Sequence, residues 1–257
     1  MSEMGLFRKK KENISSFAIH ETRKTLHKNL DFTATEQYKL LRTNLDFVLP
    51  AGEKCPVIGV TSSTRGEGKS TTSINLAYVL AEKGSKVLLI DGDLRLPSVA
   101  KKLEIENKKG LLELLMGKPI SLEEFRSPLH ENWYVLTSGE IPPNPSELLG
   151  SDRMERVLSD LRENFDHIIV DLPPVNIVSD AVSISRLITG MLVVAKEDYT
   201  EKRELEACIR QLELADVKIL GCVMTCSKSF GGGHYRSKNY KHYRKYGEYG
   251  DRTGENV

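Results

Sequence analysis

Apolar residues gather in six short runs along the middle of the chain, and each run is nearly uninterrupted. Short apolar runs without polar alternation are typical of β-strands that have helices on both faces. The first run begins at Val57, and the others cover Lys86–Asp91, Trp133–Thr137, Ile168–Val170, Met191–Ala195 and Ile219–Met224. These runs predict the strands of a buried sheet.

Segments with helical periodicity separate the apolar runs, so strands and helices alternate along the chain. This order predicts an α/β fold with a mostly parallel central sheet flanked by helices. Gly84 is placed to end the first of these helices. The predicted helices cover Ser70–Lys83, Leu111–Met116, Asp152–Glu163, Asp180–Leu187 and Glu201–Leu214.

The length and composition favour one domain with appended arms. The chain has 257 residues, of which 39% are apolar, enough for one sizeable core. We expect a flexible basic arm over residues 1–30, a P-loop domain over 31–227 and a flexible tail over 228–257. The net charge of +1 gives no overall attraction to nucleic acid or membrane, so an electrostatic partner has to be sought in local charged patches. We expect no nucleic-acid partner. The four cysteines are expected to be buried, reduced thiols.

A glycine-rich loop follows the first apolar run and leads into a predicted helix. In a P-loop, backbone N–H groups and a lysine hold nucleotide phosphates, while a hydroxyl ligates magnesium. Ser63 stands where the strict motif has glycine, and a glycine turn beside an unrelated lysine is the alternative. The candidate nucleotide-binding residues are Ser63, Thr64, Arg65, Gly66, Glu67, Gly68, Lys69, Ser70 and Thr71.

Three aspartates end two other apolar runs. Asp91 and Asp93 close the second run, and Asp171 closes the run from Ile168 to Val170. The carboxyl ends of parallel strands share one edge of a sheet, so these carboxylates are expected beside the glycine loop. Carboxylates hold magnesium or its waters, and a further carboxylate accepts a proton from an attacking hydroxyl.

The composition changes from Lys228 onward, where aliphatic residues nearly vanish and five of the nine tyrosines occur. Such a segment cannot form a core, and a flexible arm is expected. Its tyrosines suit stepwise entry into an active site. Stacking on single-stranded nucleic acid and a plain solvated linker are the alternatives. The candidate phosphoacceptors are Tyr235, Tyr240, Tyr243, Tyr246 and Tyr249.

Together these segments resemble the bacterial tyrosine kinases of capsule and exopolysaccharide synthesis, over roughly residues 34–227. The resemblance implies a P-loop NTPase-like fold, ATP and Mg²⁺ as cofactors, protein tyrosine substrates, and autophosphorylation of the tail, including transfer between subunits. The segments that carry it are Ser63–Ser70, Leu89–Arg95, Leu136–Gly139, Pro142–Leu149 and Ile168–Pro174.

A predicted helix over Thr33–Leu45 begins with a capping box of Thr33 and Glu36. In the resembled family, a helix here joins subunits into a homo-oligomeric ring through Glu, Arg and Arg at three-residue spacing. The matching positions are Glu36, Lys39 and Arg42, and lysine lacks the forked donor geometry of arginine.

No apolar stretch approaches the roughly 18 residues of a spanning helix. We therefore expect a cytoplasmic protein. The resemblance implies recruitment to the inner face of the cell membrane by a transmembrane polysaccharide co-polymerase, which acts as the activator.

The site residues have the following expected roles. Lys69 binds the terminal phosphates, Ser70 binds Mg²⁺, and Asp171 holds a metal-bound water. Asp91 is the preferred base for the phenol, with Asp93 as metal partner or alternative base, and the two roles are exchangeable. A partition- or cluster-assembly-type P-loop ATPase is the alternative function, and a nucleotide-binding scaffold is a third. The ATPases carry a signature lysine at the position of Thr64.

Overall fold

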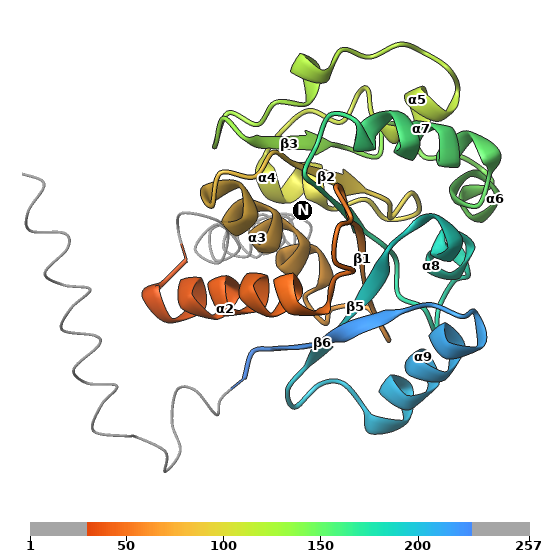
Figure 1. Ribbon diagram of the computed structural model, residues 1–257. Helices are drawn as coiled ribbons and strands as arrows, with labels where there is room; N and C mark the ends of the chain where they lie inside the picture. Colours follow the sequence, from red (N-terminus) through yellow and green to blue (C-terminus); the bar gives the residue numbers. More distant parts are fainter. Residues whose placement is uncertain (1–29, 228–257) are drawn as a thin grey trace, which may run out of the picture. The chain divides into compact units, whose positions relative to one another are not determined.

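The computed structural model describes residues 30–227. The predicted basic arm, apart from its last residue, and the predicted tail with its five candidate tyrosines lie outside the described residues. The chain divides into two units after Thr225. The fold belongs to the first unit, in which helices cover both faces of a central sheet (Figure 1).

The sheet has six strands in the order β3-β2-β4-β1-β5-β6, and every neighbouring pair is parallel. Each predicted apolar run forms one of them, which confirms the predicted fold class. Because β1 lies between β4 and β5, its carboxyl end opens near the middle of one sheet edge. The strands are β1 (Val57–Ser62), β2 (Val87–Asp91), β3 (Trp133–Leu136), β4 (His167–Asp171), β5 (Gly190–Lys196) and β6 (Ile219–Thr225).

Two hydrophobic clusters hold the helices against the sheet, one on each face. Within β2, Leu88 and Ile90 join one cluster, while Val87 and Leu89 join the other. This alternation explains the uninterrupted apolar runs, since both sets of side chains are buried. One face carries α2 (Phe32–Val48), α3 (Lys69–Glu82) and α4 (Val99–Leu103). The other carries α5 (Leu111–Leu115), α6 (Pro145–Leu149), α7 (Asp152–Arg162), α8 (Asp180–Ser183) and α9 (Lys202–Leu214), with short 3-10 helices η2 (Leu122–Phe125) and η3 (Ser185–Leu187).

Some helix boundaries differ from the prediction. Helix α2 begins at Phe32, and the Asp31 carboxylate accepts a hydrogen bond from Ala34 N at 2.8 Å. The predicted capping box of Thr33 and Glu36 is therefore wrong, because an aspartate two residues earlier satisfies the free amide. The helix predicted from Asp180 is divided into α8 and η3, and the helices α4 and α6 were not predicted.

All four cysteines are free thiols. Cys55 and Cys208 are buried, as expected, but Cys222 and Cys226 are exposed, so that part of the expectation is wrong. Cys222 lies on β6, at the edge of the sheet, where one face has little cover, and Cys226 follows this strand. A search of residues 30–227 for a helix both long and apolar enough to cross a membrane finds none.

Candidate active site

The glycine loop and two of the predicted aspartates meet at the carboxyl ends of three adjacent strands. Asp91 ends β2, Asp171 ends β4, and the two residues are partners in the parallel register. Val60 on β1 pairs with Asp171 from the other side, and the glycine loop follows two residues later. The structure thus brings together segments that are widely separated in the sequence (Figure 1).

Two glycines let the loop adopt its shape. Gly66 and Gly68 have φ values of +81° and +97°, a region that other residues rarely occupy. A Cβ on Gly68 would lie 3.1 Å from Cγ2 of Thr225, at the end of β6. Helix α3 begins at the next residue, so its free N–H groups open towards the loop.

A buried glutamate inside the loop holds it together. The Glu67 carboxylate accepts hydrogen bonds from the hydroxyls of Ser63 and Thr200, each at 2.6 Å, and from Thr64 N at 3.0 Å. The Glu67 carbonyl accepts a hydrogen bond from Thr225 Oγ1 at 2.7 Å. Ser63 therefore contributes a hydrogen bond that glycine could not make. Sequence reasoning placed Glu67 in the loop but missed this bracing role, since Thr200 and Thr225 are distant in the chain.

The loop lysine points at the aspartates. Lys69 Nζ lies 2.9 Å from Asp93 Oδ2 and 3.8 Å from Asp171 Oδ2. Burial alone would lower the pKa of Lys69, but the charges of Asp171 and Asp93 and the hydrogen bond to Asp93 outweigh it, so the pKa is raised. The lysine is thus held as a cation at the position where a nucleotide's phosphates would bind.

Asp91 is buried and its carboxylate organises the chain that follows it. Its Oδ2 accepts hydrogen bonds from Ser98 N at 3.0 Å and Val99 N at 2.9 Å, and its Oδ1 accepts one from Asp93 N at 3.3 Å. Burial, followed by the nearby charge of Asp171, raises the pKa of Asp91 to about 7. The Ser98 hydroxyl donates to Ser70 Oγ at 2.9 Å, so Asp91 also positions a partner of the predicted metal ligand.

Asp171 has no exposed surface, and the Ser73 hydroxyl donates to its Oδ1 at 3.1 Å. Its Oδ2 accepts no hydrogen bond and faces Lys69. Burial raises the pKa of Asp171, while the charge of Lys69 and the hydroxyls of Ser70 and Ser73 oppose the shift. An unsatisfied buried carboxylate oxygen beside a serine hydroxyl is a donor set that fits Mg²⁺ or its waters.

Within the described range, no three His, Cys, Asp or Glu side chains are arranged to hold a metal ion by themselves. This agrees with the behaviour of Mg²⁺ at nucleotide sites, where water and phosphate oxygens complete the coordination. Asp93, Ser70 and Asp171 would then supply only part of the coordination.

A second network that sequence reasoning missed fixes the loop carrying Asp93. The Arg95 guanidinium donates to both carboxylate oxygens of the buried Asp180, each at 2.9 Å. It also donates to Ser146 Oγ at 3.1 Å, and the Ser146 hydroxyl donates to Asp180 Oδ1. These contacts join the segment after β2 to α6 and α8. The Leu89–Arg95 and Pro142–Leu149 segments carried the signal, but only the fold shows that they touch.

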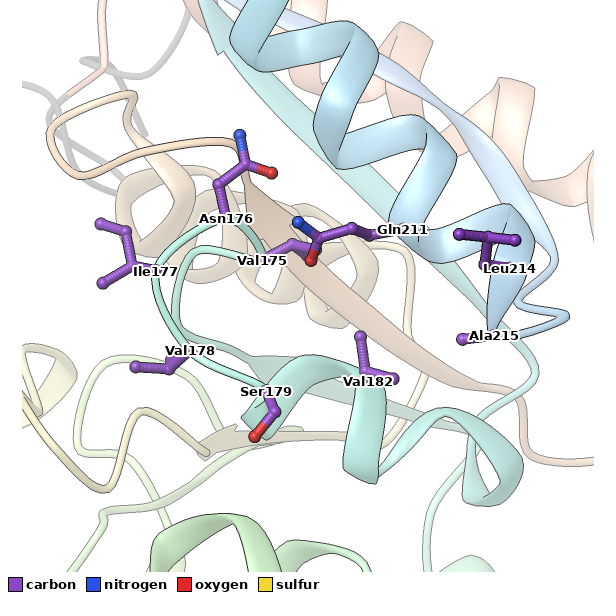
Figure 2. A pocket seen from close by; sticks show the side chains of 9 residues that line it. All are labelled: Val175, Asn176, Ile177, Val178, Ser179, Val182, Gln211, Leu214 and Ala215. Carbon is purple, nitrogen blue, oxygen red and sulfur yellow. The ribbon is translucent and has the colours of Figure 1, made fainter.

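An open pocket of about 560 Å³ lies between the segment after β4, helix α8 and helix α9 (Figure 2). Val182 from α8 and Gln211 and Leu214 from α9 contribute to its wall. The lining includes no charged side chain and no residue of the glycine loop. The pocket therefore lacks the groups that phosphates require, and the glycine loop remains the candidate site.

The sheet, the glycine loop with its lysine and the facing aspartates define the P-loop class of nucleotide-binding proteins. The family model AAA_31, described as AAA domain, matches residues 55–219. Tyrosine-protein kinase YwqD of Bacillus subtilis is 37% identical over 208 residues, which are 80% of this chain and 87% of that protein. Tyrosine-protein kinase CpsD of Streptococcus pneumoniae is 38% identical over 200 residues, 77% of this chain and 87% of that protein.

Among solved structures, the kinase domain of Escherichia coli tyrosine kinase ETK matches with a TM-score of 0.68 and 34% identity. The match covers 79% of this chain and 80% of that one. The chain belongs to the bacterial tyrosine-protein kinase family, as its sequence motifs indicated.

The raised pKa of Asp91 predicts a pH-dependent cost of folding. The unfolded chain releases this proton near pH 4, whereas the folded chain holds it up to about pH 7. Stability that is present below pH 4 is therefore lost as the pH rises to about 7. We expect urea unfolding without Mg²⁺ to show this effect between pH 4 and pH 8. Over this range the free energy of unfolding of wild type should fall by roughly 1–3 kcal/mol more than that of Asp91→Asn. The control Asp46→Asn removes a half-exposed aspartate paired with Lys83 and should follow wild type. Equal pH profiles for wild type and Asp91→Asn would contradict the assignment.

The Arg95 network predicts energetic coupling between the segment after β2 and helix α8. Arg95→Gln and Asp180→Asn should each lower the free energy of unfolding by about 1–3 kcal/mol, because either change leaves polar groups without partners. Arg95 is 40% exposed, which limits the effect through solvent screening. A double-mutant cycle should give a coupling of about 1 kcal/mol, against less than about 0.5 kcal/mol for the exposed pair Lys83 and Asp46. Additive effects at Arg95 and Asp180 would refute a shared network.

Proposed function

We propose that this protein is an ATP- and Mg²⁺-dependent protein-tyrosine kinase that phosphorylates its own carboxyl-terminal tyrosines. The observation that carries the proposal is the buried cluster in which Lys69 faces Asp93 and Asp171, with Asp91 beside them. A hydrolase needs a positioned water, whereas transfer to tyrosine needs a carboxylate near an incoming phenol. The names of the related kinases and the tyrosine-rich tail sequence support transfer to protein.

The phosphate-binding roles follow from the loop. Lys69 would bind the β- and γ-phosphates, and the N–H groups around Gly66 and Gly68 would stabilise charge on the transferring group. Thr71, in the first turn of α3, would approach the α-phosphate. When bound, Mg²⁺ would supply positive charge that offsets the negative charge of the phosphates. Its direct ligand from the protein would be Ser70, with Asp171 and Asp93 holding its waters.

Asp91 remains our proposed base for the phenol, with Asp93 as the alternative. The raised pKa of Asp91, about 7, brings this carboxyl closer to a phenol's pKa near 10 than an ordinary aspartate. Against it stand three backbone N–H groups that already use most of its lone pairs. Asp93 accepts a hydrogen bond from Lys69 and would therefore lie closer to the phosphate that is transferred. Positioning should matter more than basicity for either residue.

The alternative ATPase function is less well supported. Partition- and cluster-assembly-type relatives carry their signature lysine at the position that is Thr64 here. Arg65 is exposed and its carbonyl accepts a hydrogen bond from the Tyr199 hydroxyl at 3.1 Å. In the sequence, Arg65 is the positively charged residue next to Thr64, one position later than the signature lysine of the ATPases.

We also propose a homo-oligomeric ring that uses α2. Glu36, Leu40 and Phe47 share one helix face by their spacing, and Leu40 and Phe47 are 52% and 82% exposed. Glu36 pairs with Lys39 at 2.9 Å within the helix, and Arg42 donates to the carbonyl of Val79 on α3. A ring contact would replace the exposed Glu36–Lys39 pair at little cost.

The biological setting is inferred from the resemblance. Members of the family act in capsule and exopolysaccharide synthesis, and we propose the same process for this chain. A transmembrane polysaccharide co-polymerase would activate the kinase and hold it at the inner face of the membrane.

Mass spectrometry after incubation with Mg-ATP tests the kinase proposal. Wild type should acquire phosphate on tail tyrosines, and Lys69→Met should lose at least about 100-fold in rate, because it lacks the charge that stabilises transfer. Mixing Lys69→Met with a partner whose five tail tyrosines are phenylalanine isolates transfer between subunits. Phosphotyrosine on the Lys69→Met tail supports such transfer.

Each other outcome of that experiment has a defined meaning. Free phosphate without phosphotyrosine would support the ATPase, and binding without either product would support the scaffold. Phosphotyrosine formed by purified Lys69→Met alone at a rate close to that of wild type would overturn the assigned active site.

Light scattering tests the α2 contact. Glu36→Ala combined with Arg42→Ala should shift the oligomer to smaller species, because the polar contacts of the helix are removed. Loss of the Lys202–Glu206 pair on α9, an exposed pair of the same kind, is the control and should leave the assembly intact. Thermal unfolding should accompany the measurement, since Arg42 also binds α3. An oligomer that persists in a folded double variant would exclude α2 as the contact.

A further inference from the structure

A second lysine reaches the phosphate-binding loop from α4. Lys102 Nζ donates to the Thr71 hydroxyl at 3.3 Å. Thr71 directly follows Ser70 in the first turn of α3. The contact joins residues that are 31 positions apart in the chain. No sequence pattern distinguished Lys102 from its neighbour Lys101.

The charge on Lys102 lacks a direct counterion. Among residues 30–227 no carboxylate forms an ion pair with it, whereas Lys69 has two such partners. Burial lowers the pKa of Lys102, the charge of Asp171 raises it, and Lys69 and Lys101 lower it further. A partly buried ammonium group near another cation is unfavourable unless an anion binds between the two positive charges.

The position of Lys102 is set by the same carboxylate that lies under the loop. Asp91 Oδ2 accepts hydrogen bonds from the N–H groups of Ser98 and Val99 at the start of α4. Lys102 N in turn donates to the Ser98 carbonyl at 3.0 Å. Lys102 therefore lies within one helical turn of the residues that Asp91 binds, so a short helix fixes its position.

We propose that Lys102 is a second cationic ligand of the nucleotide and contacts its α-phosphate. The inference rests on the proposed ATP-binding function of the loop. Lys69 faces the aspartates, where the terminal phosphates would bind. Lys102 contacts Thr71, whose backbone N–H in the first turn of α3 would face the α-phosphate. The two lysines would thus neutralise opposite ends of the triphosphate. Such a contact acts on binding of ADP and ATP alike.

The alternative is a lysine whose stem lies along the protein while its ammonium is solvated. The two possibilities differ in what Lys102→Gln does to nucleotide affinity. Lys101→Gln makes the same change of charge at an exposed neighbouring residue and is a matched control.

Isothermal titration calorimetry with Mg-ADP and with a Mg-bound, non-transferable ATP analogue tests the inference on the full chain. Lys102→Gln should weaken the binding of both nucleotides by the same factor, about tenfold or more, because a charge-assisted hydrogen bond is lost. Lys102→Arg keeps the charge and should retain most of the affinity. Lys101→Gln should bind within about twofold of wild type. Thermal unfolding of each variant verifies the fold.

The other outcomes separate the two proposals. If folded Lys102→Gln binds both nucleotides like Lys101→Gln, the inference is wrong while the kinase proposal stands. A loss confined to the ATP analogue would place the contact on the γ-phosphate and overturn the α-phosphate assignment. If wild type binds neither nucleotide, the proposed function itself fails.

Discussion

The pairing of Asp91 with Asp171 across β2 and β4 is the constraint on which the site depends. Two carboxylates without exposed surface lie side by side because the parallel register aligns the ends of their strands. Such a pair is unfavourable by itself, and both pKa values are raised mainly by burial. Lys69 reduces the cost, and backbone N–H groups bind Asp91. The arrangement concentrates negative charge at the proposed magnesium site, so a metal ion bound there would stabilise the fold.

Two polar networks hold the segments that carry the site residues. Glu67 fastens the glycine loop to residues after β5 and at the end of β6. Arg95 fastens the loop carrying Asp93 to α6 and α8. Both networks centre on a carboxylate with no exposed surface, Glu67 or Asp180, and both satisfy it with several donors. Supports of this kind would hold the proposed catalytic groups in place before a nucleotide binds, which is the basis of electrostatic preorganisation.

The fold and the main site were predictable because their signals are local. Continuous apolar runs identified the strands, and the position of Asp91 and Asp171 at strand ends placed them at one edge. The remaining parts depend on contacts between distant segments. Nothing local distinguishes Thr200 or Thr225 as partners of Glu67, or Lys102 from Lys101. Helices α4 and α6 have five residues each, a length at which a periodic pattern is weak, and α5, which is equally short, is the one helix of this length that was predicted.

Chain length does not decide whether a tyrosine reaches its own site or a neighbour's. Thr225, which contacts the glycine loop through Glu67, lies only ten residues before Tyr235 in the sequence. Ten residues span at most about 33–36 Å, and the 24 residues from Thr225 to Tyr249 span at most about two and a half times that length. Extended length alone therefore does not require transfer between subunits. A ring would therefore favour transfer between subunits by raising the local concentration of neighbouring tails, and not because the tail is too short. The arrangement of subunits, more than the tether, should set which tyrosine reacts first.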